Sequence, residues 1–152
     1  MNTVRLAVVA FLALAIAAVA RAQVPQQSAP DEGPFVEHRL TLQVSDNAPA
    51  TQHLAVNVAY NVLKAFGPDK VSIEIVAFGP GIDLLRADNP EAPRIASLIQ
   101  QGVKFDACMN TVETIERDSG KPFPLNPLAR KVPAGVVQIM MLAEHGYVTV
   151  RP

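Results

Sequence analysis

The sequence is poor in cysteine, in aromatic residues and in clustered positive charge. Its 152 residues include one Cys, no Trp and two Tyr, and the formal net charge is −1. With a single cysteine, the chain lacks the intramolecular disulfide framework that holds many small secreted domains together. Lys and Arg are not clustered, and binding to phosphates needs concentrated positive charge. We therefore expect no nucleic-acid partner.

An uncharged apolar run lies near the start of the chain. It extends from Leu6 to Ala20, behind Arg5, and is followed by Arg21-Ala22. This order is typical of a secretory signal peptide, here residues 1–22, and predicts an exported protein, periplasmic or secreted. The run is shorter than the ~20 residues that span a bilayer. We therefore expect no stable membrane insertion after cleavage before Gln23, although an uncleaved anchor is the alternative.

Removal of the signal peptide changes the charge balance, because the signal peptide contains two of the basic residues. The remaining chain has 11 of the 13 Lys and Arg against all 14 Asp and Glu, a formal charge of −3. Residues 23–36 are rich in Pro and Gln without apolar periodicity, which indicates a disordered or extended segment. We expect one domain over residues 37–152, a length typical of a single hydrophobic core.

Strand and helix patterns alternate through this domain. Alternating or β-branched apolar runs predict strands over residues 38–44, 71–78, 103–107 and 147–150, and a brief strand at Val132. Helical periodicity predicts helices over residues 51–66, 93–101, 109–118 and 136–145, and a short helical turn over residues 82–86. Alternation of this kind predicts an α/β fold with a mainly parallel sheet and helices on both faces.

The helix predicted over residues 51–66 has an apolar stripe. The stripe consists of Leu54, Val58, Val62 and Phe66, four residues apart, and is flanked by Ala55, Ala59 and Leu63. The polar side consists of Gln52, Asn57, Asn61 and Lys64. The helical period predicts that the stripe faces the core and that the polar side faces solvent.

The single cysteine, Cys108, lies just beyond a predicted strand and just before a predicted helix. Open α/β sheets bind ligands at this edge, where the carboxyl ends of the strands lie. A helix that begins beside the sulfur favours the nucleophilic thiolate, because its first amide groups carry partial positive charge. We therefore treat Cys108 as a candidate catalytic residue. The alternative is a packing role, since Cys is among the residues most often buried.

Two polar residues, Asn110 and Thr111, follow the cysteine closely. They are suited either to capping the helix or to hydrogen bonding with a sulfur species on Cys108. Glu113 stands where a capping box that starts at Asn110 needs an acid, which favours capping there.

Gly79 and Gly81 follow the second predicted strand, where they suit either a structural turn or an anion site built from backbone N–H groups. Together with Asn110 and Thr111, they form a candidate sulfur or anion pocket. No phosphate-loop pattern is complete, so we expect no cofactor. The three histidines share no ligand spacing with each other or with the cysteine, so we expect no metal site. They are His38, His53 and His145.

The helix predicted over residues 136–145 is apolar nearly all round. Its apolar residues are Val136, Val137, Ile139, Met140, Met141 and Leu142. Such a helix is either central to its own core or covered by another subunit as well, and the residues leave both open.

Five blocks in order along the chain are similar to the DsrE/DsrF-like family, and specifically to its exported branch. The blocks are residues 38–46, 67–71, 76–81, 107–111 and 132–136. The resemblance covers residues 37–152. It implies a three-layer α/β/α domain with a mainly parallel sheet of about five strands, and a homo-oligomer, either a trimer or a hexamer. It also implies that Cys108 matches the cysteine on which relatives in sulfur-relay systems carry a persulfide.

Two hypotheses follow for the function. The first is a sulfur carrier or a low-turnover sulfurtransferase that acts through Cys108 with a donor and an acceptor protein. The second is a non-enzymatic oligomeric binding module of the periplasm, in which the cysteine is structural or sensitive to redox conditions.

Overall fold

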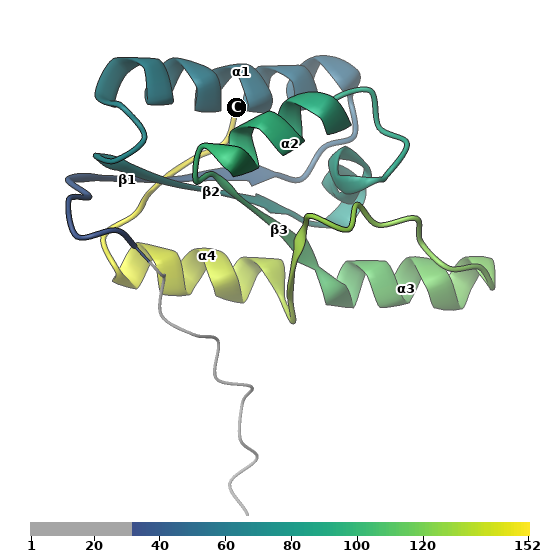
Figure 1. Ribbon diagram of the computed structural model, residues 1–152. Coiled ribbons are helices and arrows are strands. Elements are labelled where there is room, and N and C mark those ends of the chain that lie inside the picture. Colours follow the sequence, from purple (N-terminus) through teal and green to yellow (C-terminus); the bar gives the residue numbers. More distant parts are fainter. Residues whose placement is uncertain (1–31) are drawn as a thin grey trace, which may run out of the picture.

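The structure, a computed structural model, describes residues 32–152 (Figure 1). The predicted signal peptide, residues 1–22, and residues 23–31 of the segment that follows it lie outside the described residues. Strands and helices alternate along the described chain, as the sequence predicts.

Five parallel strands form one sheet in the order β4-β3-β2-β1-β5. The strands are β1 (His38–Val44), β2 (Val71–Ala77), β3 (Lys104–Cys108), β4 (Arg130–Val132) and β5 (Val148–Val150). The register places Val44 beside Ala77, and Ala77 beside Ala107, so the carboxyl ends of the three central strands lie level. Cys108 comes one residue beyond this row and pairs with Val132 of β4.

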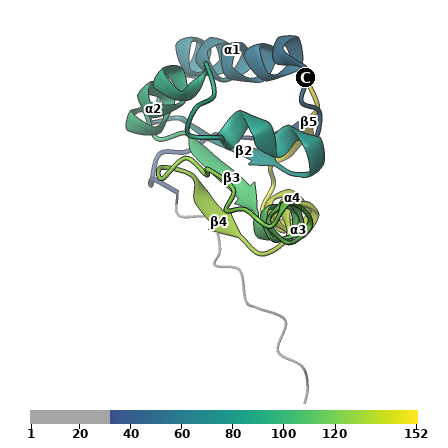
Figure 2. The same ribbon diagram turned by 90° about the vertical axis from the view of Figure 1, so that its right-hand side faces the viewer.

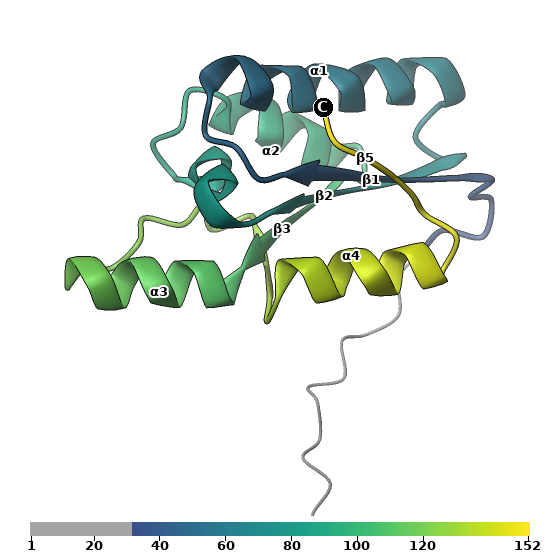
Figure 3. The same ribbon diagram turned by 180° about the vertical axis from the view of Figure 1, so that it is seen from behind.

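Helices cover both faces of the sheet, which makes three layers and confirms the predicted α/β fold class (Figures 1 and 2). One face carries α1 (Pro49–Phe66) and α2 (Ala92–Gln100), and the other carries α3 (Met109–Ser119) and α4 (Gly135–Glu144). A short 3-10 helix, η1 (Gly79–Leu85), follows β2. Seen from behind, β5 lies beside β1 and brings the carboxyl terminus toward α1 (Figure 3).

The two faces of the sheet differ in chemistry. Along β2 every residue is buried, and successive side chains point to opposite faces. Ile73 and Ile75 join the large apolar cluster that α1 and α2 cover. Val76 joins a much smaller cluster with Leu142 of α4 and Tyr147. The main core therefore lies under α1 and α2, and fewer apolar residues are buried under α4.

The predicted inward stripe of α1 is wrong in part. Leu54 is 47% exposed and Phe66 is 44% exposed, whereas Gln52, predicted to face solvent, is only 5% exposed. The buried face includes Ala55, Ala59 and Leu63, which flank the predicted stripe, and also Val56. The helix is therefore rotated about its axis relative to the predicted stripe, so that one flank of the stripe and Gln52 face the core.

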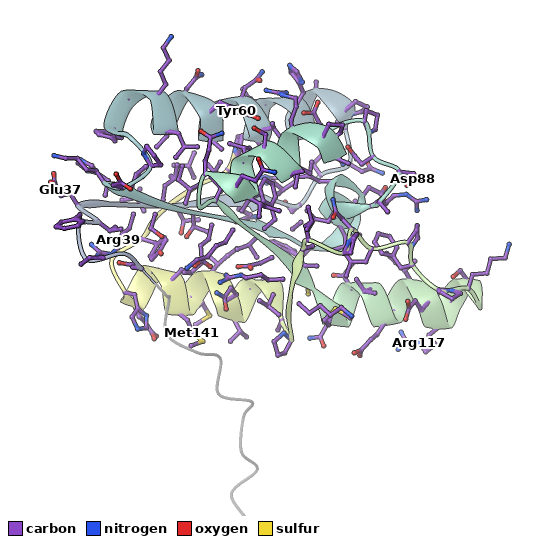
Figure 4. All side chains as sticks on the ribbon, in the orientation of Figure 1. Glu37, Arg39, Tyr60, Asp88, Arg117 and Met141 are labelled. Carbon is purple, nitrogen blue, oxygen red and sulfur yellow. The ribbon has the colours of Figure 1, made fainter. Side chains whose placement is uncertain are left out.

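The surface of α4 is apolar on the side away from the sheet. Val136 is 54% exposed, Val137 40% and Met140 59%, while Gln138 is buried against the sheet. Met141 extends from the same helix toward the outside of the molecule in Figure 4. Within residues 32–152, none of the helices has the length and apolar character needed to cross a membrane.

Candidate functional site

Cys108 is the last residue of β3 and the N-terminal capping residue of α3. Its backbone is extended, and its side chain makes no capping hydrogen bond to the helix that follows. The residue is buried, with 5% of its surface exposed. The thiol is therefore held at the carboxyl edge of the sheet, as the sequence predicts, but under a cover of neighbouring atoms.

A second helix begins beside the same thiol. A Cβ atom placed on Gly135, the first residue of α4, would lie 3.2 Å from the Cβ of Cys108 and 3.1 Å from the Cβ of Phe78. Only a residue without a side chain fits there without displacing a neighbour. In addition, the N–H group of Asn110 donates to the carbonyl oxygen of Pro133 at 3.1 Å, which ties the start of α3 to the segment before α4.

The amino ends of α3 and α4 therefore meet at Cys108. Figures 1 and 3 show the two helices end to end along one face of the sheet, running away from each other. Each helix carries partial positive charge at its amino end, worth roughly half an elementary charge. The two partial positive charges thus converge on the position of Cys108.

The structure corrects the predicted cap of α3. Asn110 lies inside the helix and is exposed, so the capping box from Asn110 to Glu113 does not form. The strand continues to Cys108 because that residue still pairs with β4, and the helix starts directly after it. Thr111 has a different role: its hydroxyl oxygen accepts a hydrogen bond from the N–H group of Gly79 at 3.0 Å.

Gly79 and Gly81 form a structural turn. The N–H group of Gly79 is bonded to Thr111, and that of Gly81 donates to the carbonyl oxygen of Phe78 at 3.1 Å. Both amides are thus used within the protein, so this loop offers neither of them to an anion. Gly81 also lies against the carbonyl group of Val44 so closely that a Cβ atom would overlap it. This close approach to the backbone of β1 explains why glycine stands at position 81.

A cavity of about 470 Å³ opens between η1 and α3, next to the turn. Its lining residues are Gly79, Pro80, Ile82, Asp83, Asn110, Thr111, Thr114 and Ile115. The structure thus brings Gly79, Asn110 and Thr111 together in one cavity wall, as the candidate pocket requires. Cys108 and Gly81 are not among the residues that line it.

A buried ionic network occupies the polar layer under α4. Arg130 donates to both carboxylate oxygens of Asp106, at 2.7 and 2.9 Å, and to the carboxylate of Glu74 at 2.6 Å. Lys104 and Gln138 add contacts to Glu74, each at 3.3 Å. Asp106 and Glu74 are both at most 1% exposed. Burial raises the pKa of Asp106 to about 7, against the opposing effect of Arg130.

This network was not predicted from the sequence, although the sequence contains one signal of it. Glu74 lies between Ile73 and Ile75 in β2, and Asp106 lies between Phe105 and Ala107 in β3, two residues before Cys108. An acid at a buried strand position needs a cationic partner, because an unpaired buried charge is very costly. Arg130 supplies that partner from β4, a pairing that depends on the strand order.

The histidines lie apart from one another in the fold. His53 of α1 contacts Glu91 at 2.9 Å, and His38 packs on the ring of Phe66 with ring centres 4.0 Å apart. His145 contacts the carbonyl oxygen of Met141 at the end of α4. Among residues 32–152, no cluster of three or more His, Cys, Asp or Glu residues is arranged to hold a metal ion.

Comparison with solved structures gives a similar fold. The chain is similar to the structure of MTH1491, a protein of unknown function from Methanobacterium thermoautotrophicum, with a TM-score of 0.67 and 27% sequence identity. The match covers 76% of this chain and 100% of that one. No family model and no curated protein matches the chain. The likeness supports the α/β arrangement of the domain.

Proposed function

We propose that the protein is an exported sulfur carrier, or a low-turnover sulfurtransferase, of the DsrE/DsrF-like family. The observation that carries the proposal is the meeting of the amino ends of α3 and α4 at Cys108. Such a site stabilises negative charge on sulfur, which both the attacking thiolate and a bound persulfide need. The fold and the five sequence blocks support the family assignment.

The proposed reaction passes one sulfur atom through Cys108. The thiolate attacks the outer sulfur of a donor persulfide, R–S–SH, and a new S–S bond forms as the donor S–S bond breaks. The donor leaves as a thiolate and takes a proton from water. An acceptor thiolate then attacks the outer sulfur on Cys108, whose thiolate is regenerated. No net oxidation takes place, so the chain needs no redox cofactor.

A second candidate function is an oligomeric binding module in which the cysteine is structural. The exposed apolar side of α4, with Val136, Val137 and Met140, favours it because such a surface is typical of subunit contacts. The resemblance implies a trimer or hexamer under either function. A monomer at micromolar concentration, measured by light scattering, would remove the main support for this second candidate.

The reactivity of the native thiol separates the two functions. Iodoacetamide modification of Cys108 is followed by intact mass, in native buffer and in denaturant at the same pH. If the protein is a sulfur carrier, we expect iodoacetamide to modify the native protein at a rate within about tenfold of the rate for the unfolded chain. The reason is that the helix ends favour attack by the thiolate. Protection of the native thiol until the protein unfolds would contradict the carrier and favour the structural cysteine.

A further inference from the structure

Asp106 and Cys108 lie on the same face of β3. Alternate residues of a strand point to the same side, and Phe105 and Ala107 belong to the core under α1 and α2. Asp106 and Cys108 therefore point to the opposite side, toward α4, where Gly135 lies against Cys108. Two residues correspond to about 7 Å along a strand. At this separation, a charge on Asp106 acts on a charge at the sulfur.

The ion pair of Asp106 is formed with the strand that lies next to the cysteine. In the register of β3 and β4, Arg130 lies beside Asp106, and Val132 lies beside Cys108. Arg130 donates to both carboxylate oxygens of Asp106 and also to the carboxylate of Glu74. Asp106 is fully buried, so water weakens the effect of its charge much less than at the surface.

Four charged side chains make up this network. Glu74 of β2 and Asp106 are acidic, and Arg130 of β4 and Lys104 of β3 are basic. The two negative and two positive charges cancel when both acids are ionised. Protonation of Asp106 leaves one positive charge in excess. Gln138 of α4 adds a neutral amide.

Two further elements contact β3 from its carboxyl end, η1 and α3. Asp83, the ionisable residue of η1, lines cavities that include neither Asp106 nor Cys108. Glu113, the first ionisable residue of α3, is exposed. The helix α2 covers the opposite face of the sheet (Figure 1). The charge in the layer beside Cys108 is therefore that of the four-residue network, and it changes with the protonation of Asp106.

This carboxyl group changes its charge near neutral pH. Burial raises the pKa of Asp106 to about 7, although its hydrogen bonds with Arg130 oppose the shift. An ionised Asp106 and an anionic sulfur on Cys108 repel each other, because both charges lie in a layer with little water. A protonated Asp106 removes this repulsion and leaves the network with a net positive charge.

We propose that Asp106 is a positioning residue for Cys108: its protonation favours an anionic sulfur there, and its ionisation opposes one. The inference deepens the proposed function and rests on it, since the carrier reaction uses the anionic sulfur. When the thiolate forms, the S–H bond of Cys108 breaks and the proton passes to water. A proton retained on Asp106 then compensates the new negative charge. The step involves no oxidant or reductant.

The pH dependence of the Cys108 modification rate by iodoacetamide tests the coupling over about pH 5–9. In the wild type, we expect the rate to rise about tenfold per pH unit below pH ~6.5 and less steeply just above pH ~7, where Asp106 ionises. In Asp106→Asn, the neutral amide should remove this shallow part. The ratio of the variant rate to the wild-type rate should thus increase from about one below pH ~6 to at least fivefold above pH ~8. A ratio that does not change with pH would overturn the proposal.

Glu74→Gln is the matched control within the network. It removes the same charge from a buried acid that is also bonded to Arg130. In the register, Glu74 lies beside Lys104, four residues before Cys108, or about 13 Å along the strand. Because the interaction of two charges weakens with distance, the increase for Glu74→Gln should be less than half of that for Asp106→Asn. An equal increase in both variants would overturn the proposal.

A second measurement needs no reagent to reach the sulfur. The thiolate absorbs in the ultraviolet, and Cys108 is the single thiol of the chain, so the difference from Cys108→Ser reports its ionisation. Above pH ~8, the ratio of thiolate to thiol should again be at least about fivefold higher in Asp106→Asn than in the wild type. Equal ratios would overturn the proposal. If Asp106→Asn does not fold, the wild-type rate profile decides, and a uniform rise through pH ~7 would refute the coupling.

The loading of sulfur from polysulfide separates this inference from the carrier function. If the rate profiles differ as expected but Cys108 gains no sulfur, the carrier proposal fails and the coupling to Asp106 stands. If Cys108 gains sulfur and the two rate profiles are parallel, the coupling is refuted and the carrier proposal stands.

Discussion

At the residue scale, the environment of Asp106 is the least expected feature of the molecule. Its carboxylate is fully buried and is bonded at both oxygens to Arg130, which is itself shared with Glu74. Desolvation raises the pKa of Asp106 to about 7, although the guanidinium acts in the opposite direction. The network therefore joins β2, β3 and β4 through their side chains.

The raised pKa of Asp106 predicts a pH-dependent stability. In the unfolded chain an Asp ionises near pH ~4, so between about pH 4 and 7 the folded state holds more protons. The contribution of Asp106 to the free energy of unfolding therefore falls as the pH rises through this range, and levels off above pH 7. Urea unfolding at pH 4–8 measures it. We expect the wild-type profile to decline relative to that of Asp106→Asn.

The control for this prediction is Asp69→Asn, an exposed residue outside the network. Its profile should follow that of the wild type. A wild-type stability that stays parallel to that of Asp106→Asn, or increases relative to it as the pH rises, would show that Asp106 is ionised in the folded state throughout the range.

At the scale of elements, the site depends on how closely α4 approaches β3. The added-Cβ distances at Gly135, 3.1 Å to Phe78 and 3.2 Å to Cys108, are shorter than ordinary packing contacts. The helix can begin this near the thiol because its first residue has no side chain. This feature cannot be read from the pattern of residues 136–145, which predicts a helix but not what its amino end touches.

A Gly135→Ala substitution tests this contact. The added methyl group should force α4 away from Cys108 and lower the free energy of unfolding by about 1–3 kcal/mol, the usual cost of overpacking. It should also slow the loading of sulfur onto Cys108, because one positive helix end moves away. Chemical denaturation and mass spectrometry measure the two effects. Gly33→Ala, at a glycine with open space around it, should match the wild type.

Loss of stability in Gly135→Ala with an unchanged loading rate would show that α4 supports the fold but not the chemistry. A variant that matches the wild type in both measurements would mean that the close approach is immaterial. Either outcome would remove α4 from the description of the site.

At the scale of the whole molecule, the order of strands and helices was predictable from the sequence. Alternating strand and helix periods place each element, and parallel connections then bring the ends of β1, β2 and β3 to one edge, where Cys108 was expected. What could not be predicted depends on contacts between distant segments. The pairing of Arg130 with Asp106 and Glu74 needs the strand order, and the bond from Gly79 to Thr111 needs the position of η1 beside α3.

The rotation of α1 shows the same limit for a single helix. Periodicity identified an amphipathic helix correctly, but it assigned Leu54 to the core and Gln52 to solvent, opposite to their observed burial. The buried side-chain oxygen of Gln52 accepts a hydrogen bond from Asn89 at 3.0 Å, a contact between distant segments of the chain. The periodicity of hydrophobic residues along a helix does not predict such contacts with distant segments.

Whether Cys108 carries sulfur is measured by the mass of the intact protein after incubation with polysulfide and removal of the excess. We expect that the wild-type protein gains the mass of one sulfur atom, that Cys108→Ser gains none, and that an acceptor thiol returns the wild type to its original mass. A wild-type protein that never gains more sulfur than Cys108→Ser would contradict this expectation.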